Sequence, residues 1–126
     1  MITGIGVDIV AIKRMEKWIL NPSLIERYFH PEELAYVKIN GNLSAPSLAA
    51  RFAAKEAFGK ALGTGLKGLV LKDIMVKNRQ NGQPEIVVFS SALKALGESS
   101  ANRVHLSLSH ENDNAIAMVV LEYVKT

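Results

Sequence analysis

Residues 51–65 read Arg51-Phe52-Ala53-Ala54-Lys55-Glu56-Ala57-Phe58-Gly59-Lys60-Ala61-Leu62-Gly63-Thr64-Gly65, and this stretch predicts the central helix of the fold. It is rich in alanine and leucine and ends on glycine, which is typical of a helix. Ser44 is suited to cap the helix, and Pro46 is suited to its first turn. We therefore expect one long helix that ends at about Leu62.

The charges of this predicted helix gather on one half of its surface. At about 100° per residue, the other half is apolar and holds Ala50, Ala53, Ala54, Ala57, Phe58 and Ala61. The charges form two i,i+4 pairs, Arg51 with Lys55 and Glu56 with Lys60. A glutamate and a lysine four residues apart, as Glu56 and Lys60 are, support any exposed helix by roughly 0.3–0.5 kcal/mol, and an ordinary solvated face is the plain interpretation. Glycine costs an exposed helix interior about 1 kcal/mol relative to alanine, so Gly59 suggests a packing or a binding reason. A binding reason would favour a phosphate and metal site on the charged half.

The first ten residues are typical of a β-strand with an acid inside it. Ile5, Val7 and Ile9 point to one face, while Ile2, Gly4, Gly6, Asp8 and Val10 point to the other. Aspartate is disfavoured inside strands, and a carboxylate between aliphatic residues needs a cation or several donors. Asp8 either marks the strand end and caps the next segment, or joins Glu56 in holding a divalent ion. Two carboxylates with substrate phosphates and water are how Mg²⁺ is usually held.

The composition limits the classes of protein to consider. The 126 residues suffice for one domain, residues 1–126. No stretch approaches the roughly 18 apolar residues of a membrane span, and the N-terminus lacks a basic leader and cleavage site. The chain has no cysteine, so we expect no disulfide framework and a cytoplasmic location. The net charge of +3 favours an anionic partner without distinguishing nucleic acid, acidic protein and phosphorylated cofactor.

The remaining segments predict short helices first and β-hairpins last. Helices are expected at 12–20, at 24–29, from residue 31 and at 90–97, and strands at 71–76, 85–89, 103–109 and 115–123. This order predicts an α+β fold with a mainly antiparallel sheet and one long helix. Lys13, Arg14 and Lys17 give the helix at 12–20 a basic face, and His110 lies where a strand gives way to a turn.

Three segments, taken in order, resemble one family. They are Gly4-Ile5-Gly6-Val7-Asp8-Ile9-Val10, residues 52–65, and Leu106-Ser107-Leu108-Ser109-His110-Glu111. Together they are similar to the bacterial holo-[acyl-carrier-protein] synthases, the short 4′-phosphopantetheinyl transferases, and the resemblance covers the whole chain. It implies the fold of that family and a Mg²⁺-dependent transfer of 4′-phosphopantetheine from coenzyme A to a serine of apo acyl carrier protein. The second product is adenosine 3′,5′-bisphosphate, and the reaction supports fatty acid biosynthesis.

The resemblance also implies roles for residues of this sequence. Asp8 and Glu56 would ligate Mg²⁺ on the coenzyme A pyrophosphate, and Lys60 would stabilise the pyrophosphate charge; these are the expected catalytic residues. The 3′-phosphate and adenosine end would meet Arg51, Ser109 and His110, while the nucleotide pocket would be shaped by Gly63, Thr64 and Gly65. Lys55 is expected to point either at phosphate or at solvent.

Partners follow from the same resemblance. Acyl carrier proteins are strongly acidic, so Lys13, Arg14 and Lys17 offer complementary charge, with Arg14 the best single candidate. An ordinary solvated basic face is the alternative. A homotrimer with active sites between subunits is implied, without showing which subunit supplies which group. The general base stays open between a metal-bound water, Glu56 and an acid near Glu32.

Two positions depart from the family, and two other functions compete. Ala11 stands where the family often has an acid, and Gln83 stands where lysine or arginine is frequent. A nucleic-acid-binding module would interleave aromatic residues with cations on a strand. The one tryptophan, three tyrosines and four phenylalanines form no such stripe, so we expect no nucleic acid partner. Another Mg²⁺-dependent nucleotide enzyme is the nearer alternative.

Overall fold

The computed structural model describes every residue from Met1 to Thr126 and shows an α+β fold. The elements in chain order are β1 (Ile2–Ala11), α1 (Ile12–Ile19), α2 (Pro22–Tyr28), α3 (Pro31–Tyr36), β2 (Lys38–Ile39), β3 (Asn42–Leu43), α4 (Ala45–Leu62), the 3-10 helix η1 (Leu71–Asp73), β4 (Ile74–Asn78), β5 (Pro84–Val88), α5 (Ser90–Glu98), β6 (Arg103–His110) and β7 (Asn114–Glu122). The helices and strands expected from the sequence are present, with bounds shifted by a few residues. A short hairpin, β2–β3, precedes α4 and was not expected from the sequence. None of the helices combines the length and the apolar character that crossing a bilayer requires.

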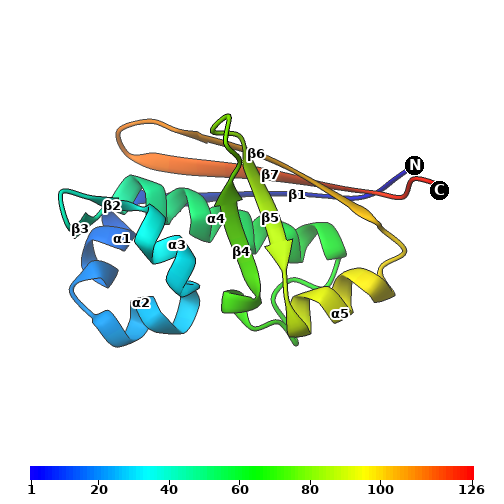
Figure 1. Ribbon diagram of the computed structural model, residues 1–126, viewed down its shortest axis with the longest axis horizontal. Helices are drawn as coiled ribbons and strands as arrows, with labels where there is room; N and C mark the ends of the chain where they lie inside the picture. The colour runs from blue at the N-terminus through cyan, green and yellow to red at the C-terminus, as the bar shows by residue number, and fades with distance from the viewer.

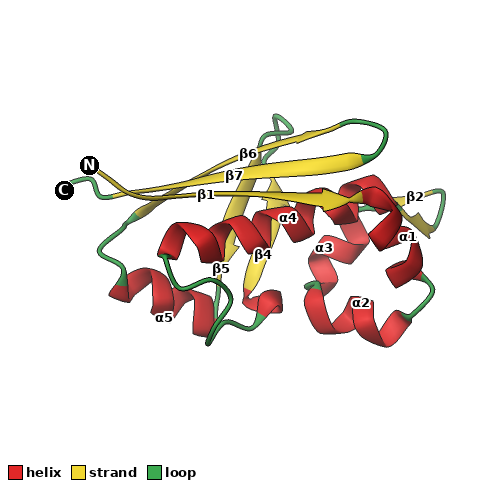
Figure 2. Ribbon diagram, turned by 180° about the vertical axis from the view of Figure 1, so that it is seen from behind, coloured by secondary structure: helices red, strands yellow, loops and turns green.

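An antiparallel sheet of order β1–β7–β6 forms one layer, and α4 runs along one of its faces (Figures 1 and 2). Helices α1, α2 and α3 gather near one end of α4, and α5 lies near the other end (Figure 1). The hairpin β4–β5 crosses between these two groups. The capping expected for α4 is confirmed, because the side chain of Ser44 accepts a hydrogen bond from Ser47 N at 3.3 Å.

Two glycines allow β1 to lie directly on α4. A Cβ atom at Gly4 would come within 2.0 Å of the Ala61 carbonyl oxygen, and one at Gly6 within 2.0 Å of the Ala57 oxygen. Real Cβ atoms do not approach a backbone oxygen so closely, so no other residue fits at either position without moving the strand. The next residue on the same face of β1 is Asp8, which this contact brings against α4.

Helix α4 is buried on more sides than its sequence predicts. The expected apolar face is confirmed, since Ala50, Ala53, Ala54, Ala57, Phe58 and Ala61 are all buried. The expectation that Arg51 and Lys55 lie on an exposed half is wrong, because both are buried as well. The reason is that α3 and β4 cover the side of α4 that faces away from the sheet, with Glu33 of α3 paired to Lys55.

The opposite face of the sheet is apolar and uncovered. We call it the outer sheet face and define it by Ile5, Val7, Ile9, Ile116 and Met118. These side chains are 41–63% exposed. On β6, the same face continues with Ser107 and Ser109, which lie in register with Met118 and Ile116. A contiguous exposed apolar patch of this kind is unusual on a monomeric protein.

Candidate active site

Asp8 of β1 is hydrogen-bonded to Lys60, which belongs to the last turn of α4. The Lys60 ammonium group donates a hydrogen bond to Asp8 Oδ1 at 2.9 Å and another to the Val7 carbonyl oxygen at 3.0 Å. The Asp8 side chain is 17% exposed and that of Lys60 is 53% exposed. The carboxylate is therefore largely shielded from water, while the cation that pairs with it stays accessible to a ligand.

Glu56 lies one helical turn before Lys60 and belongs to the same charged cluster. Burial raises the pKa of Glu56, the nearby Asp8 carboxylate raises it further, and Arg14 and Lys60 act in the opposite direction. These influences require all four charged groups to be close together. The structure thus brings together Asp8, Glu56 and Lys60, which lie 52 residues or less apart in sequence, and adds Arg14 from α1 to them.

The donor set at this cluster fits Mg²⁺ rather than a metal held by protein alone. No group of three or more histidine, cysteine or acidic side chains is positioned to ligate an ion. Two carboxylates lie near each other, and their mutual repulsion contributes to the raised pKa of Glu56. A divalent cation between them would relieve that repulsion. Mg²⁺ commonly takes one or two protein carboxylates and completes its shell with phosphate oxygens and water.

Lys55 does not reach this cluster. Its ammonium group is fully buried and donates to Glu33 Oε1 at 2.7 Å, to the Leu71 oxygen at 3.1 Å and to the Ile74 oxygen. All three donors are used within the protein, so the expectation that Lys55 points at phosphate or at solvent is wrong. Burial lowers the pKa of Lys55, and the Glu33 carboxylate opposes that shift. Lys55 is a structural tie between α3, α4 and β4.

Arg51 leaves α4 on a different side from Glu56. Its guanidinium group donates to Asn78 Oδ1 at 2.7 Å and lies 5.3 Å from the ring centroid of Tyr36. Asn78 in turn donates to the Gly82 oxygen in the β4–β5 turn. The Arg51 Nε atom is buried without a hydrogen-bond partner. Arg51 therefore faces the hairpin that carries Gln83, and not the Asp8 cluster of its own chain.

Ser109 and Asp8 lie on opposite faces of the sheet. Asp8 is opposite Ala117, which is opposite Leu108, whereas Ser109 lies in register with Ile116 and Ile9. Residues directly opposite each other in a sheet share a face, and successive residues alternate. Ser109 is therefore on the outer sheet face, where it lines a cleft of about 300 Å³ with His110, Ile9 and Ile116. Within one chain, Ser109 and Asp8 cannot touch the same atom of a ligand.

The glycine-rich loop after α4 folds back onto the helix. Gly63 ends α4 with a φ of 84°, and Gly65 N donates to the Gly59 oxygen at 3.0 Å. A Cβ atom at Gly59 would lie 2.6 Å from the Gly65 oxygen. The chain's own loop is thus the group that approaches Gly59, so of the two reasons open for this glycine, packing and binding, the structure supports packing.

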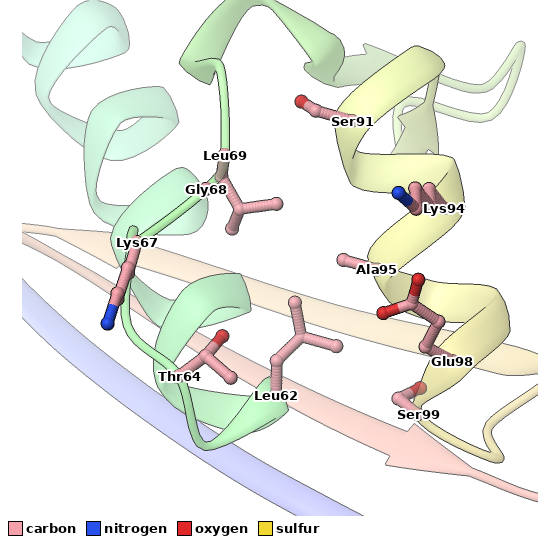
Figure 3. A pocket seen from close by; sticks show the side chains of 10 residues that line it. All are labelled: Leu62, Thr64, Lys67, Gly68, Leu69, Ser91, Lys94, Ala95, Glu98 and Ser99. Carbon is pink, nitrogen blue, oxygen red and sulfur yellow. The ribbon is translucent and has the colours of Figure 1, made fainter.

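Thr64 lines a polar cleft between this loop and α5 (Figure 3). The cleft has a volume of about 550 Å³, and its wall is formed by Leu62, Thr64, Lys67, Gly68, Leu69, Ser91, Lys94, Ala95, Glu98 and Ser99. Neither Asp8, Glu56 nor Lys60 lines it. This cleft and the charged cluster are therefore lined by different residues.

The sequence matches the 4′-phosphopantetheinyl transferase superfamily over residues 4–119. A holo-[acyl-carrier-protein] synthase of Treponema denticola is 54% identical over 122 residues, which span 97% of this chain and 99% of that protein. One from Treponema pallidum (strain Nichols) is 43% identical, with 97% of each chain covered. The chain belongs to the 4′-phosphopantetheinyl transferase superfamily.

Solved structures of this superfamily agree with the fold described above. The crystal structure of the holo-[acyl-carrier-protein] synthase from Neisseria meningitidis superposes with a TM-score of 0.86 at 38% identity, covering 97% of this chain and 99% of that one. The Helicobacter pylori enzyme in complex with coenzyme A gives a TM-score of 0.81 at 32% identity, covering 94% and 99%.

The two departures from the family pattern lie outside the charged cluster. Ala11 is exposed at the end of β1, directly before α1. Gln83 lies in the β4–β5 turn, where its side chain accepts from Arg79. Sequence reasoning missed a different feature of this transferase, the aromatic group of Trp18, Tyr28 and Phe52 beside Arg14. The only available signal was the spacing of Trp18 four residues after Arg14 and of Phe52 four residues before Glu56.

Proposed function

We propose that this chain transfers 4′-phosphopantetheine from coenzyme A to a serine hydroxyl of apo acyl carrier protein and releases adenosine 3′,5′-bisphosphate. One observation carries the proposal. In a chain of this superfamily, Asp8 from β1 and Glu56 and Lys60 from α4 converge on one partly exposed charged cluster. That cluster combines the groups needed to hold a metal diphosphate, which are paired carboxylates and an accessible cation.

Asp8 and Glu56 would hold Mg²⁺ in this proposal. When bound, the ion would neutralise charge on the diphosphate and polarise the phosphoryl group that is transferred. Lys60 donates to Asp8 in the free protein and is exposed enough to turn toward a phosphate oxygen. A lysine ammonium group acts on phosphate as a point charge with several donors. Lys60 would therefore exchange one anionic partner for another when coenzyme A binds.

The same proposal requires a second copy of the chain, and we propose a homotrimer with its sites between subunits. Ser109 lies on the outer sheet face and Arg51 faces the β4–β5 hairpin, so neither reaches the Asp8 cluster of its own chain. The exposed aliphatic side chains of the outer sheet face supply an apolar surface for association. Arg51, Ser109 and His110 of one subunit would then meet coenzyme A that is held by Asp8 and Glu56 of its neighbour.

Helix α1 provides the surface proposed for the acidic carrier protein. Lys13, Arg14 and Lys17 are all exposed on it, and Arg14 is close enough to Glu56 to lower the pKa of that carboxyl group. A carrier attracted to this basic surface would have its serine near the charged cluster.

The test is a transfer assay on the purified chain. The chain is incubated with coenzyme A, MgCl2 and apo acyl carrier protein, and the intact mass of the carrier is measured. We expect a gain equal to one phosphopantetheine group, and we expect none when EDTA replaces MgCl2. A carrier of unchanged mass, in the presence of a folded chain and all reagents, would refute the function. Release of a different nucleotide product would favour another Mg²⁺-dependent nucleotide enzyme.

A further inference from the structure

Arg14 lies against two aromatic rings, unlike the other cations of α1. Its guanidinium carbon lies 4.8 Å from the ring centroid of Trp18 and 4.9 Å from that of Phe52. The Trp18 and Phe52 rings meet edge to face, with centroids 4.9 Å apart and planes at 74°. A guanidinium group in contact with two rings is restrained by its neighbours although the side chain is exposed.

The two rings are themselves fixed. Phe52 is 3% exposed and belongs to the core side of α4, one turn before Glu56. Trp18 packs with partial stacking on Tyr28 of α2, with ring centroids 5.3 Å apart. We call the Trp18 and Phe52 rings the clamp on Arg14. Because α1, α2 and α4 supply Trp18, Tyr28 and Phe52 respectively, the clamp and the ring behind it join these three helices.

Lys13 and Lys17 are cations of the same helix whose side chains lie over no aromatic ring, and they serve as a comparison for Arg14. Both are exposed on α1, and neither lies over an aromatic ring or forms an ion pair. A flexible ammonium group attracts an acidic partner without fixing its orientation. Arg14 takes part in no ion pair of the structure. Contact with two rings therefore leaves its N–H donors open to a carboxylate, which a guanidinium group can bind through two parallel hydrogen bonds.

We infer that Trp18 is a positioning residue, which together with Phe52 holds Arg14 as a fixed anchor for one carboxylate of the acidic acceptor protein. This inference rests on the proposed function, because it takes the acceptor to be the carrier protein. Lys13 and Lys17 supply long-range attraction, whereas the clamped Arg14 sets the orientation in which the acceptor serine reaches the charged cluster. Orienting a side chain before binding removes the ordering cost that binding otherwise carries.

The experiment compares Trp18→Leu, Trp18→Phe and Lys17→Ala with the parent chain in steady-state transfer. Loss of the clamp should raise KM for the apo carrier roughly three- to tenfold in Trp18→Leu, with KM for coenzyme A unchanged. Trp18→Phe keeps an aromatic face and should restore most of the carrier affinity. Lys17→Ala should instead weaken the salt dependence of carrier binding.

A double-mutant cycle separates positioning from a general structural role. In an Arg14→Ala background, Trp18→Leu should cause no further rise in KM for the carrier, because the group that it positions is gone. An equal rise in both backgrounds, or an equal rise in KM for coenzyme A, would overturn the inference. Trp18→Met serves as a second variant if Trp18→Leu fails to fold by circular dichroism.

Direct titration of the apo carrier, without coenzyme A, distinguishes failure of the inference from failure of the proposed function. Carrier binding that depends jointly on Trp18 and Arg14, with no mass gain in the transfer assay, would support the anchor and refute the transferase activity. Normal transfer, together with a carrier affinity that does not change when Trp18 is replaced, would support the transferase activity and refute the anchor.

Discussion

Lys55 and Glu33 form a fully buried ion pair at 2.7 Å, and every hydrogen-bonding atom of the pair is in use. Glu33 Oε1 also accepts from His30 N at 2.9 Å, and Glu33 Oε2 accepts from Val76 N at 3.0 Å. The pair thus joins α3 and β4 to α4, the helix that also carries Glu56. The two charges can be buried here because the ammonium group and both carboxylate oxygens have hydrogen-bond partners.

Replacing Lys55 with methionine should destabilise the fold. Lys55→Met leaves the Glu33 carboxylate buried without its cation, which typically costs about 3–5 kcal/mol. Urea unfolding measures the change. Lys94→Met, at an exposed position of α5, should shift stability by no more than about 0.5 kcal/mol. If Lys55→Met kept its stability and raised only KM for coenzyme A, then Lys55 would be a ligand contact and not a structural tie.

A second stability prediction concerns the contact of β1 with α4. Gly6→Ala places a Cβ atom 2.0 Å from the Ala57 oxygen, so the strand must move off the helix, and we expect a loss of about 3 kcal/mol, high in the range for overpacking. Gly97→Ala in α5 meets no atom within 4 Å and should stabilise by about 0.4–1 kcal/mol. Thermal unfolding of the two variants gives the comparison. A Gly6→Ala variant as stable as the parent would contradict the close approach.

Helix α4 shows how far sequence patterns predict this fold. Its span and its alanine face follow from local rules, because capping, composition and the 3.6-residue period act within neighbouring turns. The burial of Lys55 does not, since its partner Glu33 lies 22 residues earlier in an unrelated segment. A periodic pattern assigns a helix one buried face, and it fails for a helix covered on two sides.

The sequence predicted which residues form the charged cluster better than it predicted how the site residues lie relative to one another. Asp8 stood out because a carboxylate inside an aliphatic strand needs a cation, and the structure supplies Lys60. The separation of Ser109 from Asp8 depends on the register of β1 and β6 against β7, which joins opposite ends of the chain. The clamp on Arg14 and the Tyr28 ring behind it likewise join three helices, and no local pattern specifies such contacts.

Removing either carboxylate of the proposed metal site should abolish transfer. Asp8→Ala takes away one of the two carboxylates and the partner of Lys60, while far-ultraviolet circular dichroism should stay that of the parent. Asp113→Ala, an exposed acid in the β6–β7 turn, is the matched control and should keep full activity. Isothermal titration with MgCl2 and coenzyme A should show binding to the control and weak or no binding to Asp8→Ala. Retained turnover in Asp8→Ala would remove this residue from the metal site.

The raised pKa of Glu56 gives a pH-dependent stability in the absence of metal. Burial and Asp8 raise this pKa while Arg14 and Lys60 oppose the shift, so the folded chain keeps a proton that the unfolded chain has lost. The protonated group contributes stability below the ordinary glutamate pKa, and that contribution is lost as the pH rises through the raised pKa. Glu56→Gln cannot ionise, so in EDTA it should be more stable than the parent at neutral pH.

The difference between Glu56→Gln and the parent should shrink as the pH falls toward the ordinary glutamate value. Urea unfolding across this range measures it. A constant difference at every pH would show that Glu56 titrates normally in the folded chain.

The outer sheet face should hold the subunits together. Val7 is 51% exposed at its centre, and Val7→Glu would bury a carboxylate without a partner in any apolar interface formed there, which is strongly unfavourable. We expect the parent to be a trimer by light scattering, and Val7→Glu to be a monomer with little transfer activity. Leu93→Glu, at a similarly exposed position of α5, should remain a trimer and active, because α5 lies away from this face (Figure 1). An active, trimeric Val7→Glu variant would place the subunit contact elsewhere and leave the separation of Ser109 from Asp8 unexplained.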